Sequence, residues 1–286
     1  MKQFMQQIDN ANVWVEEFDS LADNLMYAKD NKKRKESDTK SPEKFKWTGS
    51  ADLDSAVDMG LAGWHEIRPQ VDSLFARVES NINLAMGDMF ESRFNVCGDS
   101  ADIDRYLMGD PECMIDYVDV PQARMGRVVR LLINGSANSG ISPDKIMERG
   151  VIVCTLIDVL NRMNVGVEVY LENCTGVWTA NQFHSLLVKL HTSEQLLDVD
   201  NLMFAIAHPS MLRRVSFSVM EKSQWQYAAE IAKKGGGYGQ AKPCKLDKFV
   251  NADVVMQNFE FGNGNFEDDA LKYVMSTVTG LGLVEC

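Results

Sequence analysis

The loop at residues 135–140 holds the side chains whose types and spacing come closest to a ligand site. Hydroxyl and amide oxygens come from Asn134, Ser136, Asn138 and Ser139, directly after the apolar run 128–133. Such oxygens could bind Mg²⁺, but that ion usually needs a carboxylate ligand, and this loop has none. A phosphate cradle is the other possibility, yet the loop lacks both the Gly-Lys-Ser/Thr ending of a P-loop and the G-x-G-x-x-G spacing. We therefore predict no metal and no nucleotide hydrolysis here, and a small-residue turn that caps a helix is the simpler interpretation.

The other residue types that could do catalysis form no recognised motif. The four histidines include no H-E-x-x-H pair, and His184 and His191 would lie on opposite faces of one strand. No serine has the G-x-S-x-G context. The six cysteines contain no C-x-x-C pair, which argues against a zinc-finger or thioredoxin motif and indicates a reduced compartment. We expect no catalytic residue and no cofactor.

Two basic segments stand out on a chain whose net charge is −12. Residues 29–48 hold eight cationic and four acidic side chains, and residues 233–248 hold five and one. Cationic loops bind phosphates, and a neighbouring aromatic ring can stack on an unpaired base, at about 1–3 kcal/mol per base. We predict nucleic-acid contacts by Lys32, Lys33, Arg34, Lys35, Trp47, Lys233, Lys234, Tyr238 and Lys242. The alternative is that both segments are solvated loops.

A third cationic pair follows His208 in the sequence HPSMLRR. Pro209 suits the start of a helix, because its missing N–H is not needed there. Arg213 and Arg214 could bind phosphate or carboxylate groups. We include both among the predicted nucleic-acid contacts, with structural ion pairs as the alternative.

Apolar periodicity predicts a mixed α/β chain. We expect strands near 115–120, 127–134, 165–172, 183–190 and 252–257, and helices near 143–162, 198–221 and 266–279. Ser142 and Pro143 mark the start of the helix at 143–162, which should bury Leu156 and Ile157. An apolar stripe over residues 4–28 indicates a further helix, and residues 29–46 are interpreted as a mobile loop.

These elements suggest two regions. Residues 1–95 are predicted to be a mainly helical N-terminal region with the basic loop 29–46, and residues 96–286 an α/β domain. That domain is expected to contain a three-layer, mostly parallel sheet, Rossmann-like or von Willebrand A-like. The composition, 45% hydrophobic and 24% charged, is that of a globular protein. With no signal-peptide core and no apolar run of membrane-spanning length, we expect no membrane segment.

The strand–loop–helix unit resembles the metal-ion-dependent adhesion motif of von Willebrand A-type domains. In that motif Asp-x-Ser-x-Ser follows a hydrophobic strand, and the resemblance covers roughly residues 127–175. This chain departs from it by having Asn134 in place of the Asp and Asn138 in place of the second Ser. The resemblance implies an interaction module whose metal site is not kept.

Four further segments resemble a family of uncharacterised tailed-phage proteins. They are residues 47–50 (WTGS), 63–64 (GW), 147–150 (MERG) and 208–214 (HPSMLRR). This resemblance spans most of residues 47–280 and implies a phage origin with an α/β core. The chain is also similar in general character to the single-stranded DNA-binding RNA polymerase cofactors of certain podoviruses. The similarity consists of an acidic composition and two basic segments that neighbour aromatic residues.

The sequence thus favours a non-enzymatic phage protein that binds single-stranded DNA as a transcription or replication cofactor. Its expected partners are single-stranded DNA and a phage RNA polymerase, with a homo-oligomer left open. The expected location is the cytoplasm of the infected bacterial host. The alternative is a von Willebrand A-like scaffold that binds proteins without DNA, and a nucleotide-dependent enzyme using the 135–140 loop is a third possibility.

Overall fold

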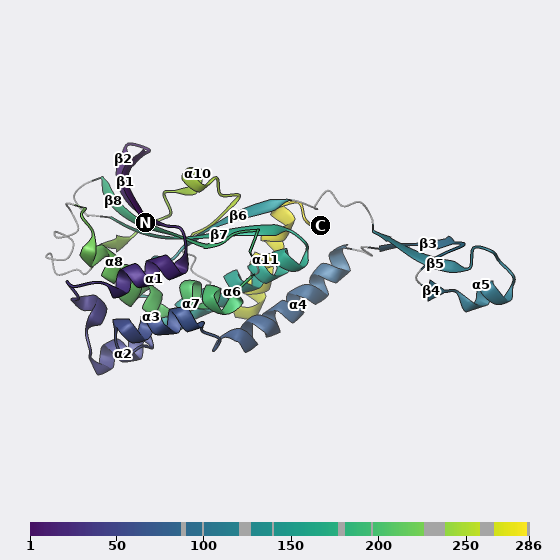
Figure 1. Cartoon of the computed structure of the whole chain (residues 1–286), viewed down its shortest axis with the longest axis horizontal. Coiled ribbons are helices and arrows are strands. Elements are labelled where there is room, and N and C mark those ends of the chain that lie inside the picture. Colours follow the sequence, from purple (N-terminus) through teal and green to yellow (C-terminus); the bar gives the residue numbers. More distant parts are fainter. Residues whose placement is uncertain are drawn as a thin grey trace.

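The computed structural model has a central mixed sheet with helices packed against it and a smaller sheet that projects from the body (Figure 1). It describes residues 1–86, 90–98, 100–119, 127–138, 140–176, 181–195, 197–225, 238–257 and 266–284. The strand order in the central sheet is β1-β2-β8-β7-β6-β10, and β9 pairs with β7. The strands are β1 (Lys2–Ile8), β2 (Ala11–Phe18), β6 (Val128–Asn134), β7 (Gly166–Gly176), β8 (Gln182–His191), β9 (Gln240–Ala241) and β10 (Val254–Met256).

The strand–loop–helix–strand unit predicted from the sequence is present as β6, α6 (Pro143–Arg162) and β7. Strands β6 and β7 run parallel. The Ser142 side chain caps α6 by accepting a hydrogen bond from the backbone N–H of Lys145. The helix buries Leu156 and Ile157 almost completely, which confirms both as core residues.

The α/β class is confirmed, but the sheet is mixed rather than mostly parallel. Strand β6 pairs in parallel with β7 and β10, and β2 pairs in parallel with β8. In contrast, β7 with β8 and β1 with β2 are antiparallel. Strand β7 ends at Gly176 and β8 begins at Gln182, too few residues for the crossover that a parallel pair requires.

The first 18 residues form a hairpin, which corrects the helix predicted over residues 4–28. Asp9 and Asn10 join β1 to β2 with φ of 46° and 64°, the positive values that a two-residue hairpin turn favours. In β2, Val13 and Val15 face one side of the sheet and Phe18 the other, the alternation of a strand.

Four α-helices and one 3₁₀-helix follow the hairpin in the described residues: α1 (Leu21–Lys29), η1 (Glu36–Asp38), α2 (Pro42–Thr48), α3 (Leu53–Ala62) and α4 (Arg68–Met86). The region is therefore helical only from residue 21 to residue 86. Because β2 pairs with β8, the predicted boundary at residue 95 separates strands that share one sheet.

Helices cover one face of the central sheet, and a short segment covers the other (Figure 1). Helix α6 contacts α4, α7 (Val199–Ala207) and α11 (Phe266–Gly280). The opposite face of the sheet packs against Leu246 and Val250. Leu246 directly precedes the short helix α10 (Asp247–Val250), and Val250 is its last residue.

The helix predicted over residues 198–221 is interrupted at His208. Helix α7 ends before it, and the π-helical turn η2 (Met211–Ser216) and helix α8 (Phe217–Lys222) follow. His208 has an extended backbone, with φ −82° and ψ 125°, because the ring of Pro209 sterically disfavours the helical conformation in the residue before it. Gly150 lets α6 approach α7 closely, since a Cβ there would lie 2.0 Å from the Ala207 Cβ.

Residues 90–119 form a separate unit, which we call the arm (Figure 1). It contains β3 (Phe90–Asn95), β4 (Ser100–Ala101), α5 (Ile103–Leu107) and β5 (Met114–Asp119), in the sheet order β3-β5-β4. The strand predicted at 115–120 is thus real, but it belongs to the arm and not to the central sheet.

Candidate functional site

The basic segment 29–46 is ordered, which corrects its interpretation as a mobile loop. The carboxylate of Glu221 accepts hydrogen bonds from Asn31 Nδ2 at 2.8 Å and from the backbone N–H of Lys35 at 3.2 Å. It also accepts from the backbone N–H and the hydroxyl of Ser37, at 3.0 Å and 2.7 Å. One carboxylate on α8 therefore fixes the path of the chain between α1 and α2.

Arg214 fixes the same segment from η2 and cannot contact a phosphate as predicted, because it is fully buried. Its guanidinium donates to the backbone carbonyls of Ser37, Thr39, Ser50 and Ala51 at 2.9–3.1 Å. Burial lowers the pKa of Arg214. Five N–H donors in a fixed fork suit this cluster of carbonyls.

Arg34 and Tyr238 also make contacts within the fold. The Arg34 guanidinium donates two hydrogen bonds of 2.9 Å to the Asp54 carboxylate and thereby lowers the pKa of Asp54. Tyr238 is only 7% exposed, and its ring stacks on Phe217 with centroids 3.7 Å apart. Its hydroxyl donates to Glu221 at 2.5 Å. Because so little of the ring is exposed, Tyr238 cannot stack on a base as predicted.

The other predicted contacts have mixed environments. Arg213 is half-buried, with its guanidinium 4.7 Å from the centroid of the Trp47 ring. Lys242 is half-buried, and its ammonium donates to Gln240 at 3.2 Å. Lys233 and Lys234 lie outside the described residues.

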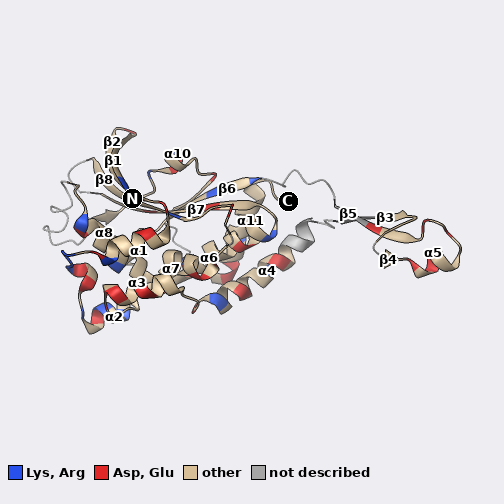
Figure 2. Ribbon diagram, viewed as in Figure 1, with Lys and Arg blue, Asp and Glu red and all other residues tan. Residues whose placement is uncertain are grey.

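Four of the lysines near α1 and α2 remain available to a ligand. Lys32, Lys33, Lys35 and Lys46 are exposed, and in the described part of the chain none of them forms an ion pair. Phe45 lies beside Lys46 and is 54% exposed. We call these five residues the basic surface; Figure 2 shows Lys and Arg positions interspersed with Asp and Glu positions between α1 and α2.

Next to the basic surface is a cleft of about 550 Å³. Trp47 and Trp64 line it together with Met59 and Met147. Glu43, Glu66, Asp144 and Lys46 also line it and are exposed to solvent. The cleft therefore has an aromatic, apolar interior and a charged mouth.

His208 lines the interior of this cleft and is 95% buried, being 5% exposed. Its ring packs edge-on against Trp64, with centroids 4.6 Å apart, and stacks on Phe204. The Nδ1 atom accepts a hydrogen bond of 3.2 Å from the backbone N–H of Ser210. Burial lowers the pKa of His208 to about 4, so the imidazole is neutral at pH 7 and carries its proton on Nε2.

The cleft brings together all four segments that carry the phage resemblance. Residues 47–50 and 63–64 contribute its tryptophans, residues 147–150 a methionine, and residues 208–214 the histidine. A hydrogen bond of 2.6 Å between the Ser50 and Ser210 hydroxyls joins the first segment to the last. Sequence reasoning found the segments, but it did not show that they meet.

A family model described as "Domain of unknown function (DUF7192)" matches residues 5–285. The chain belongs to this family. No curated protein and no solved structure matches the chain. Because the match covers nearly the whole sequence, the DUF7192 domain includes both the body with its cleft and the arm.

In this DUF7192 chain the loop after β6 uses its polar groups internally. Asn134 Oδ1 accepts from the backbone N–H of Ser136, and Asn134 Nδ2 donates to the Lys242 carbonyl, both at 2.9 Å. The Ser136 hydroxyl donates to the Cys174 carbonyl at 2.9 Å. Ser139 lies outside the described residues. Over the described ranges, no group of three or more His, Cys, Asp or Glu side chains is arranged to hold a metal ion.

The two strand histidines are buried away from the cleft. His184 Nε2 lies 3.3 Å from Glu16 Oε2, with both side chains at most 1% exposed. Burial disfavours the charged form of Glu16, but hydrogen bonding and charge interaction with His184 outweigh it and lower the pKa of that carboxyl. His191 is 7% exposed. Neither histidine is accessible enough to serve a solvent-borne ligand.

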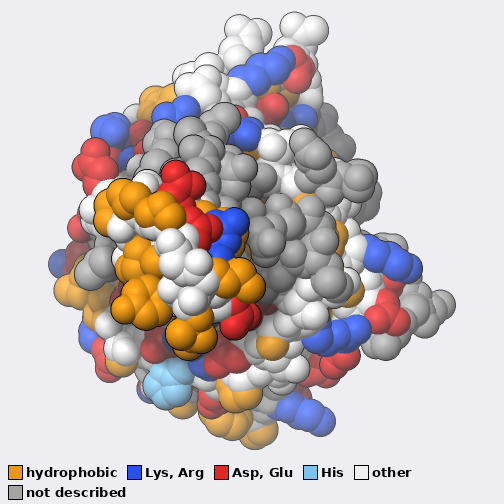
Figure 3. Space-filling view, turned by 90° about the vertical axis from the view of Figure 1, so that its right-hand side faces the viewer, with side chains coloured by type: hydrophobic (Ala, Val, Ile, Leu, Met, Phe, Trp, Pro, Cys, Tyr) orange, Lys and Arg blue, Asp and Glu red, His pale blue; other side chains and the backbone are white. Residues whose placement is uncertain are grey.

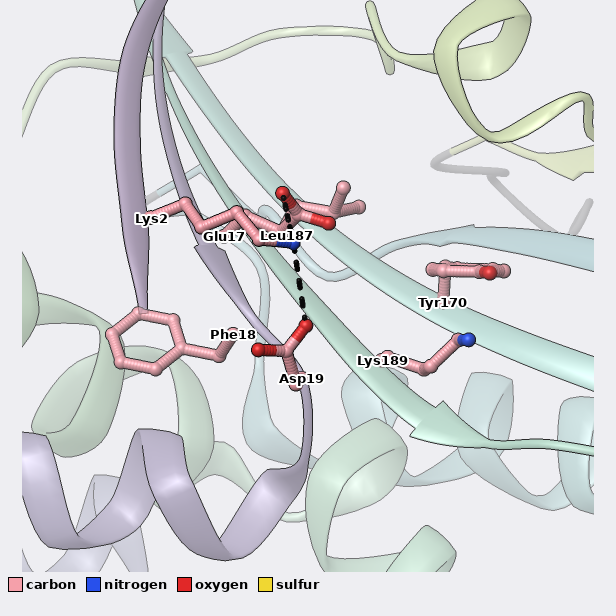
Figure 4. Close-up of a pocket in the computed structure, with 7 residues that line it drawn as sticks. All are labelled: Lys2, Glu17, Phe18, Asp19, Tyr170, Leu187 and Lys189. Atoms are coloured by element: carbon pink, nitrogen blue, oxygen red, sulfur yellow. Dashed lines mark ion pairs between the residues drawn. The ribbon is translucent and has the colours of Figure 1, made fainter.

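A second, small cavity of about 190 Å³ lies at the C-terminal end of β2 (Figure 4). Lys2 forms ion pairs with Glu17 at 3.5 Å and Asp19 at 3.6 Å. The ammonium of Lys189 lies 5.5 Å from the centroid of the Tyr170 ring. The two lysines that line this cavity therefore already have partners within the chain.

The arm exposes an apolar patch, seen end-on in Figure 3. Val96, Ile103, Tyr106, Leu107 and Met108 are between 66% and 85% exposed. A cluster of this kind on a folded protein is typical of an interaction surface. No helix of the described residues is both long and apolar enough to span a membrane.

Proposed function

We propose that the chain binds single-stranded DNA through the basic surface and acts as a non-enzymatic cofactor of a phage RNA polymerase in the infected cell. The observation that carries this proposal is a set of four exposed lysines that form no ion pair within the described part of the chain, three of them between α1 and α2 and one on α2, together with the exposed ring of Phe45 on α2. The order imposed by Glu221 and Arg214 supports it, because a preorganised surface loses less conformational entropy on binding.

A single strand suits this surface better than a duplex does. Unpaired bases offer faces on which Phe45 can stack, whereas the bases of a duplex already stack on one another. The rest of the chain is strongly acidic and repels a duplex that extends beyond the lysines.

The test is fluorescence anisotropy with single- and double-stranded oligonucleotides at two salt concentrations. Replacing Lys32, Lys33 and Lys35 with Gln should weaken binding to all single strands alike and reduce the salt slope by about 0.7 for each phosphate that the variant no longer binds. The matched control replaces Lys2, Lys145 and Lys272, which lie elsewhere, and changes the net charge equally. The Phe45→Ala variant should weaken binding without changing the slope, since stacking releases no counterions.

The proposal fails if the parent protein does not bind single strands at low salt. It also fails if the control triple variant weakens binding as much as the Lys32, Lys33 and Lys35 variant, because the charge would then act through the whole protein.

We also propose that the body is related to the doubly wound, von Willebrand A-like folds. The order β8-β7-β6-β10 corresponds to the 3-2-1-4 order of such sheets; here β8 runs antiparallel to β7, and β2 and β1 extend the sheet beyond it. The segment that contains α10 would be the thin third layer.

A second candidate function, a scaffold that binds another protein without DNA, is favoured by the apolar patch of the arm. Asp104 and Glu112 are exposed near this patch, so a complementary partner would have an apolar groove with a basic rim. Titration with the phage polymerase should give binding that a Leu107→Asp, Met108→Asp double variant abolishes. Equal binding by this variant would show that the arm is not the docking surface.

A further inference from the structure

We propose that the cleft takes one nucleobase that bears an exocyclic amino group, from a strand held on the basic surface. This inference deepens the proposed function and rests on it. It starts from a donor inside the cleft, acceptors at the mouth and aromatic walls between them.

The donor is the Nε2–H of His208. In the described part of the chain no hydrogen bond is made by this atom, whereas Nδ1 is occupied by Ser210. Gly49, with φ +71°, keeps the edge of the ring uncovered, because a Cβ there would lie 3.2 Å from Nε2. A ligand that places an acceptor against this N–H gains a hydrogen bond inside the cleft.

The acceptors are the carboxylates of Glu43, Glu66 and Asp144 at the mouth. A ligand that fits must therefore present an acceptor inward and a donor outward, on a flat apolar body. A cytosine meets this requirement with its ring carbonyl on the minor-groove side and its amino group on the major-groove side. Thymine has a carbonyl where the amino group would be, and that oxygen would face a carboxylate.

A cationic ligand, such as a lysine or arginine side chain of a partner, fits less well. Ammonium and guanidinium groups have no acceptor for the His208 donor. Arg213 already lies 4.7 Å from the Trp47 ring centroid, which places a positive charge close to that wall. The carboxylates at the mouth would attract a cation, but the His208 donor and the nearby positive charge of Arg213 disfavour a cation inside the cleft.

The position of α2 connects the cleft to the strand. Its Phe45 is exposed at the basic surface, its Trp47 lines the cleft, and Lys46 belongs to both. A phosphate held by Lys46 would thus leave its own base beside the mouth of the cleft.

The experiment compares dC8 with dT8, which are both weakly stacked pyrimidine strands, by anisotropy. We expect the parent protein to bind dC8 about three- to tenfold more tightly, the range of one net hydrogen bond. His208→Phe should abolish this preference and leave the salt slope unchanged, and Gly49→Ala, which covers Nε2, should do the same if the first variant does not fold. His65→Phe is the matched control on an exposed histidine, and it should retain the preference.

The lysine variants separate the inference from the function on which it rests. Replacing Lys32, Lys33 and Lys35 with Gln should weaken the binding of dC8 and of dT8 by the same factor. The ratio of the two affinities should therefore stay unchanged. Equal affinity of the parent for the two strands, or a preference that survives in both cleft variants, overturns the inference and leaves DNA binding intact.

If neither strand binds, the proposed function fails, and the cleft is then tested alone with free nucleosides. Deoxycytidine, but not thymidine, should quench the tryptophan fluorescence, and His208→Phe should abolish the quenching. No quenching by either nucleoside overturns the inference.

Discussion

Replacing Glu221 with Gln should loosen the basic segment without removing any side-chain volume. The Glu221 carboxylate accepts five hydrogen bonds from Asn31, Lys35, Ser37 and Tyr238. An amide offers one acceptor oxygen and one NH₂ group. With the NH₂ at the Oε1 position, the Tyr238 hydroxyl can rotate to accept, but the backbone N–H of Ser37 then faces another donor.

The energetic cost follows from these hydrogen bonds. One buried N–H is left without an acceptor, at about 1–3 kcal/mol, and the remaining bonds no longer have an ionic acceptor. We expect a loss of about 2–3 kcal/mol in the free energy of unfolding, or about 3–5 °C in Tm for a chain of this size. Thermal unfolding followed by circular dichroism measures it, with Glu194→Gln on an exposed carboxylate as the matched control.

Limited trypsin digestion adds a local measurement. Cleavage after Lys32, Lys33 and Lys35 should accelerate in the Glu221→Gln variant, because their backbone is then less restrained. An unchanged Tm together with an unchanged cleavage rate would refute the view that Glu221 organises the segment.

Three further predictions concern the core, the cleft and the loop after β6. Leu156→Ala should cost about 2–5 kcal/mol in chemical denaturation, because the residue is fully buried; a loss under about 1 kcal/mol would contradict its core position. The folded state holds the pKa of His208 near 4, below the ordinary 6.5, so the unfolded state takes up the proton first as pH falls. Stability should therefore decline between about pH 6.5 and 4, by up to about 3 kcal/mol, and His208→Asn should flatten this dependence. Calorimetry with Mg²⁺ should show no saturable site in the loop, since Asn134 and Ser136 are bonded within the chain, and a stoichiometric signal that disappears in Ser136→Ala would contradict this.

The central unit of the fold could be predicted because its signals are local. The N-cap at Ser142, the proline after it and the apolar runs on either side all lie within a few tens of residues. The N-terminal hairpin was missed because its apolar residues fit helical spacing about as well as alternation. The turn at Asp9 and Asn10 was the available signal, since both residue types tolerate positive φ.

The candidate site depends on contacts that no local pattern reveals. Arg213 and Arg214 are adjacent in the sequence, and helical geometry then directs one toward the aromatic surface and the other into the core. Ser37 and Glu221 are 184 residues apart. Composition could identify a basic segment, but not the distant carboxylate that orders it.

The pairing of β2 with β8 and of the basic segment with Glu221 has a consequence for biosynthesis. Translation delivers the N-terminus first, yet β2 has no neighbour but β1 until β8 has been made, and the basic segment has no anchor until Glu221 emerges. A nascent chain shorter than about 220 residues therefore carries its lysines on an unfastened stretch. The ordered basic surface can form only after Glu221 has emerged, so translation products that end before this residue would lack it.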